Sequence, residues 1–247
     1  MCIRDRSRPA GRLWSTRWST ASFTLRPEQV SARRLLAEGT GTLFLLVGVV
    51  GSGIMAARLS PTDEGLQLFQ NAVATACVLI AVIAVFGTIS ADFNPAVTLA
   101  AWALGHRAGR DVPFMIIAQV VGAVAGTVLA NLMFDLPAVD WSTTSRTGGP
   151  LWLGEVVATV GLLLVVFSLV CTSRTAHLPY VVGAYIGGAY YFTSSTSFAN
   201  PAVTIGRTLS DTFAGIDPTC APMFILMQVV GVGVAVALLR ALFPTAS

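Results

Sequence analysis

The chain has 247 residues, of which 54% are hydrophobic and 11% are charged, and its mean hydropathy is +0.73. So apolar a composition excludes an ordinary soluble domain and indicates a membrane protein. The formal net charge of +3 is unevenly distributed, because residues 1–34 hold eight Arg against two acidic residues. Since the basic residues are not spread over a fold, we expect no nucleic-acid partner.

The first 32 residues differ from the rest of the chain. They are rich in Arg and Ser and lack an apolar core, so they are not a secretory signal, and they resemble an organellar presequence only faintly. We interpret residues 1–32 as an atypical or non-native leader that is disordered, and residues 33–247 as the folded domain.

Six apolar stretches of about 20 residues follow, each long enough to cross a bilayer as a helix. They cover residues 35–57, 68–87, 113–134, 151–172, 178–197 and 220–243. Two shorter segments, 94–103 and 200–209, follow the second and fifth stretches, and each is about half a spanning helix. The sequence therefore predicts an all-α membrane protein with six transmembrane helices and two re-entrant half-helices.

The distribution of Arg over the predicted loops indicates the orientation. With the N-terminus inside, twelve Arg lie on the inner side, and three lie outside: Arg58, Arg146 and Arg207. Without the leader the ratio is still six to three. We expect a multi-pass protein of the plasma membrane with both termini in the cytoplasm.

The second half of the chain repeats the first. The order Glu, Thr, Asn-Pro-Ala-Val-Thr, Gln occurs twice, roughly 110 residues apart, which is too long a period for a solenoid. It is found at Glu38, Thr42, 94–98 and Gln119, and again at Glu155, Thr159, 200–204 and Gln228. Three spans per half is an odd number, so half 148–243 crosses in the opposite sense to half 33–137. Such inverted repeats build a site near the middle of the bilayer in membrane transport proteins.

The two Asn-Pro-Ala boxes have the signature of a helix start, because Asn is a good N-cap and Pro suits the first turn. Inversion points the helices beginning at Asn94-Pro95 and Asn200-Pro201 toward each other, so their positive dipole ends meet. The two Asn side chains can then present NH₂ donors to an oxygen atom, while cations are disfavoured. This pattern predicts a channel for small neutral solutes that carry oxygen.

On these motifs the chain resembles the major intrinsic protein family, the aquaporins and aquaglyceroporins, over residues 33 to 243. The resemblance implies six tilted helices, two half-helices and a pore in each subunit of a homotetramer. The pore motifs would be Asn94, Pro95, Ala96, Asn200, Pro201 and Ala202. Glu38 and Glu155 would support the half-helix loops by accepting backbone N–H groups. The expected partners are the bilayer and small neutral solutes; we expect no cofactor, no metal and no enzymatic activity.

The selectivity filter departs from the family pattern. Typical members follow the second box with Arg, where this chain has Val203; Arg207 lies one helical turn further on and is not expected to substitute for it. Counting back from the loops places Thr75 and Gly188, or Gly187 with a one-residue shift, at the other filter positions. A wide, uncharged filter follows, suited to glycerol, urea and metalloid hydroxides such as arsenous acid, besides water.

A second departure precedes the first box. The family usually reads Ser-Gly-x-His-x-Asn, whereas this chain reads Ser-Ala-Asp-Phe-Asn, one residue shorter and with Asp92 in place of His. Asp92 either caps the half-helix or biases the inner mouth against anions.

Two other classes of function remain as alternatives. A secondary active transporter can also use an inverted repeat, and its ion coupling would depend on Glu38, Asp92 or Glu155, the buried carboxylates of the predicted spans and loops. For Glu38 and Glu155 a proton relay or a salt bridge is the alternative to loop support. A structural membrane protein without conduction is disfavoured by the small residues of the predicted filter.

Overall fold

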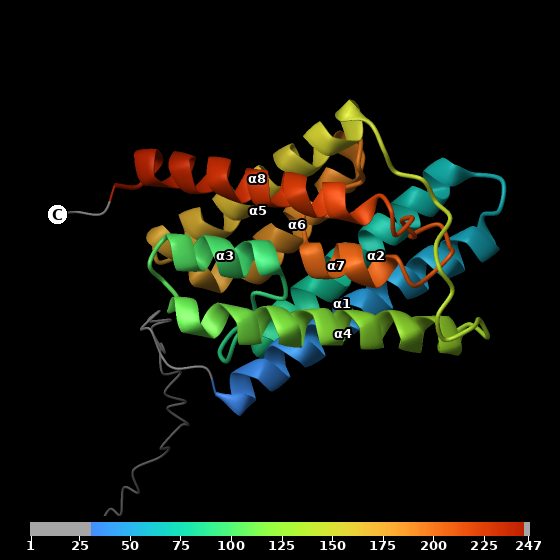
Figure 1. Ribbon diagram of the computed structural model, residues 1–247, viewed down its shortest axis with the longest axis horizontal. Coiled ribbons are helices and arrows are strands. Elements are labelled where there is room, and N and C mark those ends of the chain that lie inside the picture. The colour runs from blue at the N-terminus through green and yellow to red at the C-terminus, as the bar shows by residue number, and fades with distance from the viewer. Residues whose placement is uncertain (1–30, 245–247) are drawn as a thin grey trace, which may run out of the picture.

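A computed structural model describes residues 31–244, which form eight α-helices (Figure 1). They are α1 (Ala32–Leu59), α2 (Glu64–Phe86), α3 (Pro95–Ala103), α4 (Val112–Met133), α5 (Gly149–Cys171), α6 (Leu178–Phe192), α7 (Pro201–Arg207) and α8 (Ala221–Leu242). The leader predicted for residues 1–32 lies outside the described residues except for its last two, which cap and begin α1.

The helix starts follow from local sequence signals. Ser31, Asp63, Asn94 and Asn200 each accept a hydrogen bond from a backbone N–H of the first helical turn. Among the described helices, α3 to α8 all carry Pro in their first two positions, where its missing N–H costs nothing. Each helix is therefore delimited locally before tertiary packing.

Five helices of the described chain are long and apolar enough to cross a membrane: α1, α2, α4, α5 and α8. The predicted span 178–197 is helical only as far as Phe192, because the backbone after it turns away to bond a buried carboxylate described below. The 15 residues of α6 measure about 22 Å at 1.5 Å per residue, less than a full crossing.

Each half packs its first and last long helices together, α1 on α4 and α5 on α8, and α2 lies against α6 across the two halves. Small residues allow the close approach, among them Gly122 and Gly126 of α4. A Cβ at Gly122 would collide with the carbonyl oxygen of Gly39, and one at Gly126 with that of Leu43. Gly183 of α6 is similarly pressed against α2.

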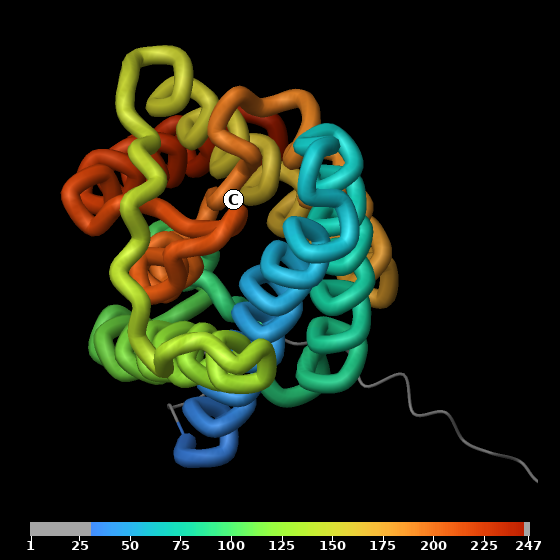
Figure 2. The backbone as a smooth tube through the Cα atoms, turned by 90° about the vertical axis from the view of Figure 1, so that its right-hand side faces the viewer, coloured from blue at the N-terminus to red at the C-terminus, as the bar shows by residue number. Residues whose placement is uncertain are grey.

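The half-helices α3 and α7 lie end to end between the long helices (Figure 1). Segment 135–148 passes across the outer end of α7 on its way from α4 to α5 (Figure 2), where the backbone N–H of Ser142 donates to Thr208 O at 2.9 Å. The six long helices bring both ends of the described chain to one side of the bundle (Figure 1). The all-α architecture of the prediction is confirmed, with two half-helices in matching places.

Candidate functional site

A buried carboxylate on α1 holds the loop that precedes α3. Glu38 accepts the backbone N–H groups of Asp92 at 2.9 Å and Phe93 at 2.7 Å, and the hydroxyl of Ser90 at 2.6 Å. Gln119 of α4 donates to the same carboxylate at 2.8 Å and to the hydroxyl oxygen of a half-helix threonine. A carboxylate can be buried this completely because all these donors compensate for its lost hydration.

The second half repeats the backbone and glutamine contacts of this arrangement. Glu155 of α5 accepts the backbone N–H groups of Phe198 and Ala199, both at 2.9 Å. Gln228 of α8 donates to Glu155 and to the hydroxyl of Thr204 in α7. The inverted repeat of the sequence is thus preserved in the hydrogen bonds that fix both loops.

The two boxes cap their own half-helices. The Oδ1 atom of Asn94 accepts from Ala96 N at 2.8 Å, and that of Asn200 accepts from Ala202 N at 2.9 Å. Pro95 and Pro201 occupy the first helical positions. Each box therefore presents the N-terminal end of a helix to the interior of the bundle.

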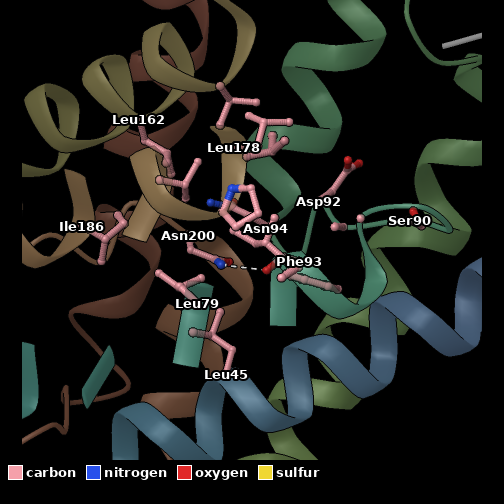
Figure 3. A pocket seen from close by; sticks show the side chains of 18 of the residues that line it. Leu45, Leu79, Ser90, Asp92, Phe93, Asn94, Leu162, Leu178, Ile186 and Asn200 are labelled. Carbon is pink, nitrogen blue, oxygen red and sulfur yellow. Dashed lines mark hydrogen bonds between the residues drawn. The ribbon is translucent and has the colours of Figure 1, made fainter. Parts of the chain in front are cut away.

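The boxes are also tied to each other. Nδ2 of Asn94 donates to Ala199 O at 2.7 Å, and Nδ2 of Asn200 donates to Phe93 O at 2.8 Å, the bond drawn in Figure 3. Phe93 and Ala199 both have φ of 48°, an uncommon conformation outside glycine, which aims each carbonyl at the opposite asparagine. An amide NH₂ has two donors, so each asparagine retains one N–H beyond this bond.

Both asparagines line a cavity of about 660 Å³. It reaches from Ser90 and Arg107 near the ends of α2 and α3, past Asn94 and Asn200, to Arg207 at the end of α7. Much of its wall is aliphatic and includes Leu45, Leu79, Leu162 and Ile186 (Figure 3). An apolar passage with a few fixed donors can accommodate a small neutral molecule whose oxygen atoms accept hydrogen bonds.

Thr75, Tyr190 and Val203 line the same cavity beyond the asparagines. The hydroxyl groups of Thr75 on α2 and Tyr190 on α6 lie 3.1 Å apart. Among the described residues that line the cavity there is none from the α1–α2 connection or from segment 135–148. The cavity lining therefore stops short of both of these segments.

Gly188, which counting back assigns to the filter, is not among the residues that line the cavity. The face of α6 toward the cavity carries Val182, Ile186 and Tyr190, spaced one helical turn apart. Gly188 is half a turn away from this face, and a Cβ there would approach the ring of Phe192. Fewer residues therefore separate the cavity-facing position of α6 from Asn200 than counting back assumes. The four-residue spacing of Val182, Ile186 and Tyr190 is the sequence signal that indicates Tyr190.

At the end of the cavity near Ser90, Asp92 forms an ion pair with a neighbouring arginine. Its Oδ2 atom lies 2.7 Å from an Nη of Arg107 and accepts the hydroxyl of Thr98 at 2.8 Å. Asp92 thus bonds Thr98 of α3 and Arg107 of the connection that follows α3. Nearby, the ring of His106 stacks on Phe167, and burial lowers the pKa of His106, which favours its neutral form at pH 7.

The described residues include no cluster of three or more His, Cys, Asp or Glu side chains that could hold a metal ion.

The sequence is similar to a known family and to known proteins. The family model described as Major intrinsic protein matches residues 26–198. The chain is 46% identical over 209 residues to "Aquaglyceroporin AqpS" of Rhizobium meliloti, covering 84% of this chain and 89% of that protein. It is 28% identical over 227 residues to "Probable aquaporin AqpM" of Archaeoglobus fulgidus, covering 81% and 92%.

A solved structure gives the same fold. The aquaglyceroporin from Plasmodium falciparum superposes with a TM-score of 0.64 over 87% of this chain and 99% of that one, at 20% identity. The six long and two half-helices therefore form a known arrangement.

Proposed function

Because the chain belongs to the major intrinsic protein family, we propose that it is a passive transmembrane channel for water and small neutral solutes, with glycerol as the principal organic solute. The carrying observation is one cavity in which two asparagines, each at the start of a half-helix, meet between opposed helix ends. No coupling ion or cofactor enters this proposal.

The asparagine pair would select by hydrogen bonding and charge. The remaining N–H of Asn94 and of Asn200 can each donate to a passing oxygen atom, so a hydroxyl or water is oriented between them. The positive ends of α3 and α7 act at the same point and disfavour a cation. Rigid tethering through Phe93 O and Ala199 O keeps both donors in place without reorganisation.

The filter of this proposal is Thr75, Tyr190 and Val203, with Tyr190 in place of Gly188. One wall is then aromatic and aliphatic, and the hydroxyls of Thr75 and Tyr190 lie 3.1 Å apart in the same cavity lining as Val203. A polyol has carbon on one side and hydroxyls on the other, so glycerol suits such a wall better than a fully polar slot. Urea and arsenous acid are also small, neutral and hydrogen-bonding, and we include them as further solutes.

The contacts of the carboxylates favour a channel over a secondary transporter. Glu38 and Glu155 are each occupied by at least three donors, and Asp92 pairs with Arg107. Moving a proton or ion through any of them would disrupt a loop or an ion pair.

We place the channel in the cell membrane as a homotetramer with cytoplasmic termini.

Reconstitution tests the channel directly. Liposomes containing the protein, shifted separately into sucrose, glycerol and urea gradients, should shrink and then recover their volume in glycerol and urea faster than empty liposomes. Saturable uptake that requires an ion gradient would instead establish the transporter.

Two adjacent tyrosines provide a matched test of the filter. Tyr190→Ala should raise glycerol and urea entry severalfold relative to water, because it removes the ring opposite Val203. Tyr191→Ala is the control, since Tyr191 is exposed on the outer face and bonds Gly65 O. Equal effects of the two substitutions would mean that Tyr190 does not set the filter.

A further inference from the structure

Arg207, the last residue of α7, is a buried charged residue. Its side chain is 2% exposed, and its Nε donates to Ala214 O. The guanidinium carbon lies 3.5 Å from the ring centroid of Phe198. Within the described residues, Nη1 has no hydrogen-bond partner, although burying an unsatisfied charged donor is costly.

The guanidinium packs on Phe198, in the loop that precedes α7. Val203 and Arg207 are four residues apart, hence on one face of the helix, and both line the cavity. Long helical side chains point toward the helix N-terminus. Phe198, which the guanidinium covers, stands only two residues before Asn200. The charge therefore lies nearer to the level of Val203 than the position of Arg207 in the sequence suggests.

Two arginines share the Phe198 ring, but only one faces the cavity. The guanidinium carbon of Arg146 lies 5.3 Å from the ring centroid, and the side chain donates to Gly215 O at 2.9 Å and Phe213 O at 3.3 Å. Arg146 and Arg207 thus both secure the 213–215 backbone. Arg146 does not line the cavity, and neither arginine forms an ion pair with a described carboxylate.

We propose that Arg207 supplies the charged hydrogen-bond donor of the outer constriction, one helical turn beyond the position at which the family motif places its arginine. Its unpartnered Nη1 donates to the hydroxyl or carbonyl oxygen of a neutral solute as the solute passes Tyr190 and Val203. Its charge excludes cations at that level. The filter is then charged, in contrast to the uncharged filter expected from Val203 alone. The inference builds on the channel function proposed above.

The test uses reconstituted liposomes in which neutral-solute entry and sodium entry are measured in the same preparation. Arg207→Gln should raise sodium entry by about fivefold or more, since repulsion of about 1 kcal/mol remains between unit charges at 4 Å even in water. Arg146→Gln is the matched control, because it removes contacts with the same ring and the same backbone segment without altering the cavity lining. Arg207→Lys keeps the charge and should keep sodium excluded.

Each outcome is decisive. Unchanged sodium entry in a folded Arg207→Gln channel would overturn the proposal, as would an equal rise in Arg146→Gln, which would mean that the loop is merely loosened. Where Arg207→Gln does not fold, sodium entry through the wild-type channel well above that of empty liposomes would overturn it without any variant. Glycerol entry in the wild type separates these results from a failure of the channel function, since the channel can conduct glycerol whether or not Arg207 excludes cations.

Discussion

At the residue scale, the pore loops depend on a few buried polar atoms that satisfy one another. Glu38 and Glu155 are the acceptors for loop N–H groups that would otherwise be unpaired at the level of the membrane interior. Gln119 and Gln228 hold each carboxylate in place from the last helix of each half. Charged residues are retained within apolar spans because they pair these loop N–H groups.

Glu38→Gln and Glu155→Gln should each lower the free energy of unfolding by about 1–3 kcal/mol, because an amide has only one oxygen to accept the two backbone N–H groups. Thermal unfolding in mild detergent measures the loss. Glu64→Gln, on the exposed first turn of α2, is the control and should change stability by less than about 0.5 kcal/mol. Unaltered stability together with a lost pH dependence of transport would support the proton-relay alternative.

At the element scale, the distance between paired helices is set where a glycine meets a backbone. α4 approaches α1 so closely at Gly122 and Gly126 that the nearest atoms include carbonyl oxygens, which cannot move as a side chain can. The same helices carry Glu38 and Gln119, so the packing of α1 on α4 also positions the loop before α3.

Gly122→Ala should therefore separate α1 from α4 and cost about 1–3 kcal/mol, the usual cost of overpacking a tight contact. The expected signs are a lower unfolding temperature and reduced glycerol entry. Gly233→Ala on α8 is the matched control, because no atom lies within 4 Å of a Cβ built there. A folded, fully conducting Gly122→Ala channel would show that this contact is not limiting.

At the scale of the whole molecule, the inverted repeat gives two half-helices that enter from opposite sides of the bundle and meet at their N-terminal ends (Figure 1). Each half supplies one box, one carboxylate and one glutamine. Neither half alone completes the site, since each asparagine bonds the loop of the other half.

The proposed orientation is tested by labelling intact cells with a membrane-impermeant maleimide, in a background where the native cysteines are replaced by serine. Thr62→Cys, in the exposed α1–α2 connection, should react without lysis. Arg174→Cys, in the exposed α5–α6 connection at the opposite end, should react only after lysis. The reverse pattern would place the termini outside.

The sequence by itself determined the apolar spans and the duplication, because hydropathy, caps and a repeated order of polar residues are local or periodic signals. The two glutamates could be matched with each other from their positions in the repeat, and so could the two glutamines, but the bond from each glutamine to a glutamate comes from the structure. The half-helix starts at Asn94 and Asn200 were equally evident, since Asn-Pro has one strong interpretation within an apolar context.

Only the tertiary structure decided which side chains line the cavity beside the asparagines. Counting residues assigns Gly188, but the course of the loop before α7 turns Tyr190 toward Thr75 instead. Sequence distance likewise separates Arg207 from the filter, whereas packing on Phe198 directs its guanidinium back toward Val203. Asp92 acquires its partner, Arg107, from across α3. The physical reason is common to all three: the rotation of a helix face and the direction of a long side chain depend on what packs against them, and that is absent from the order of residues.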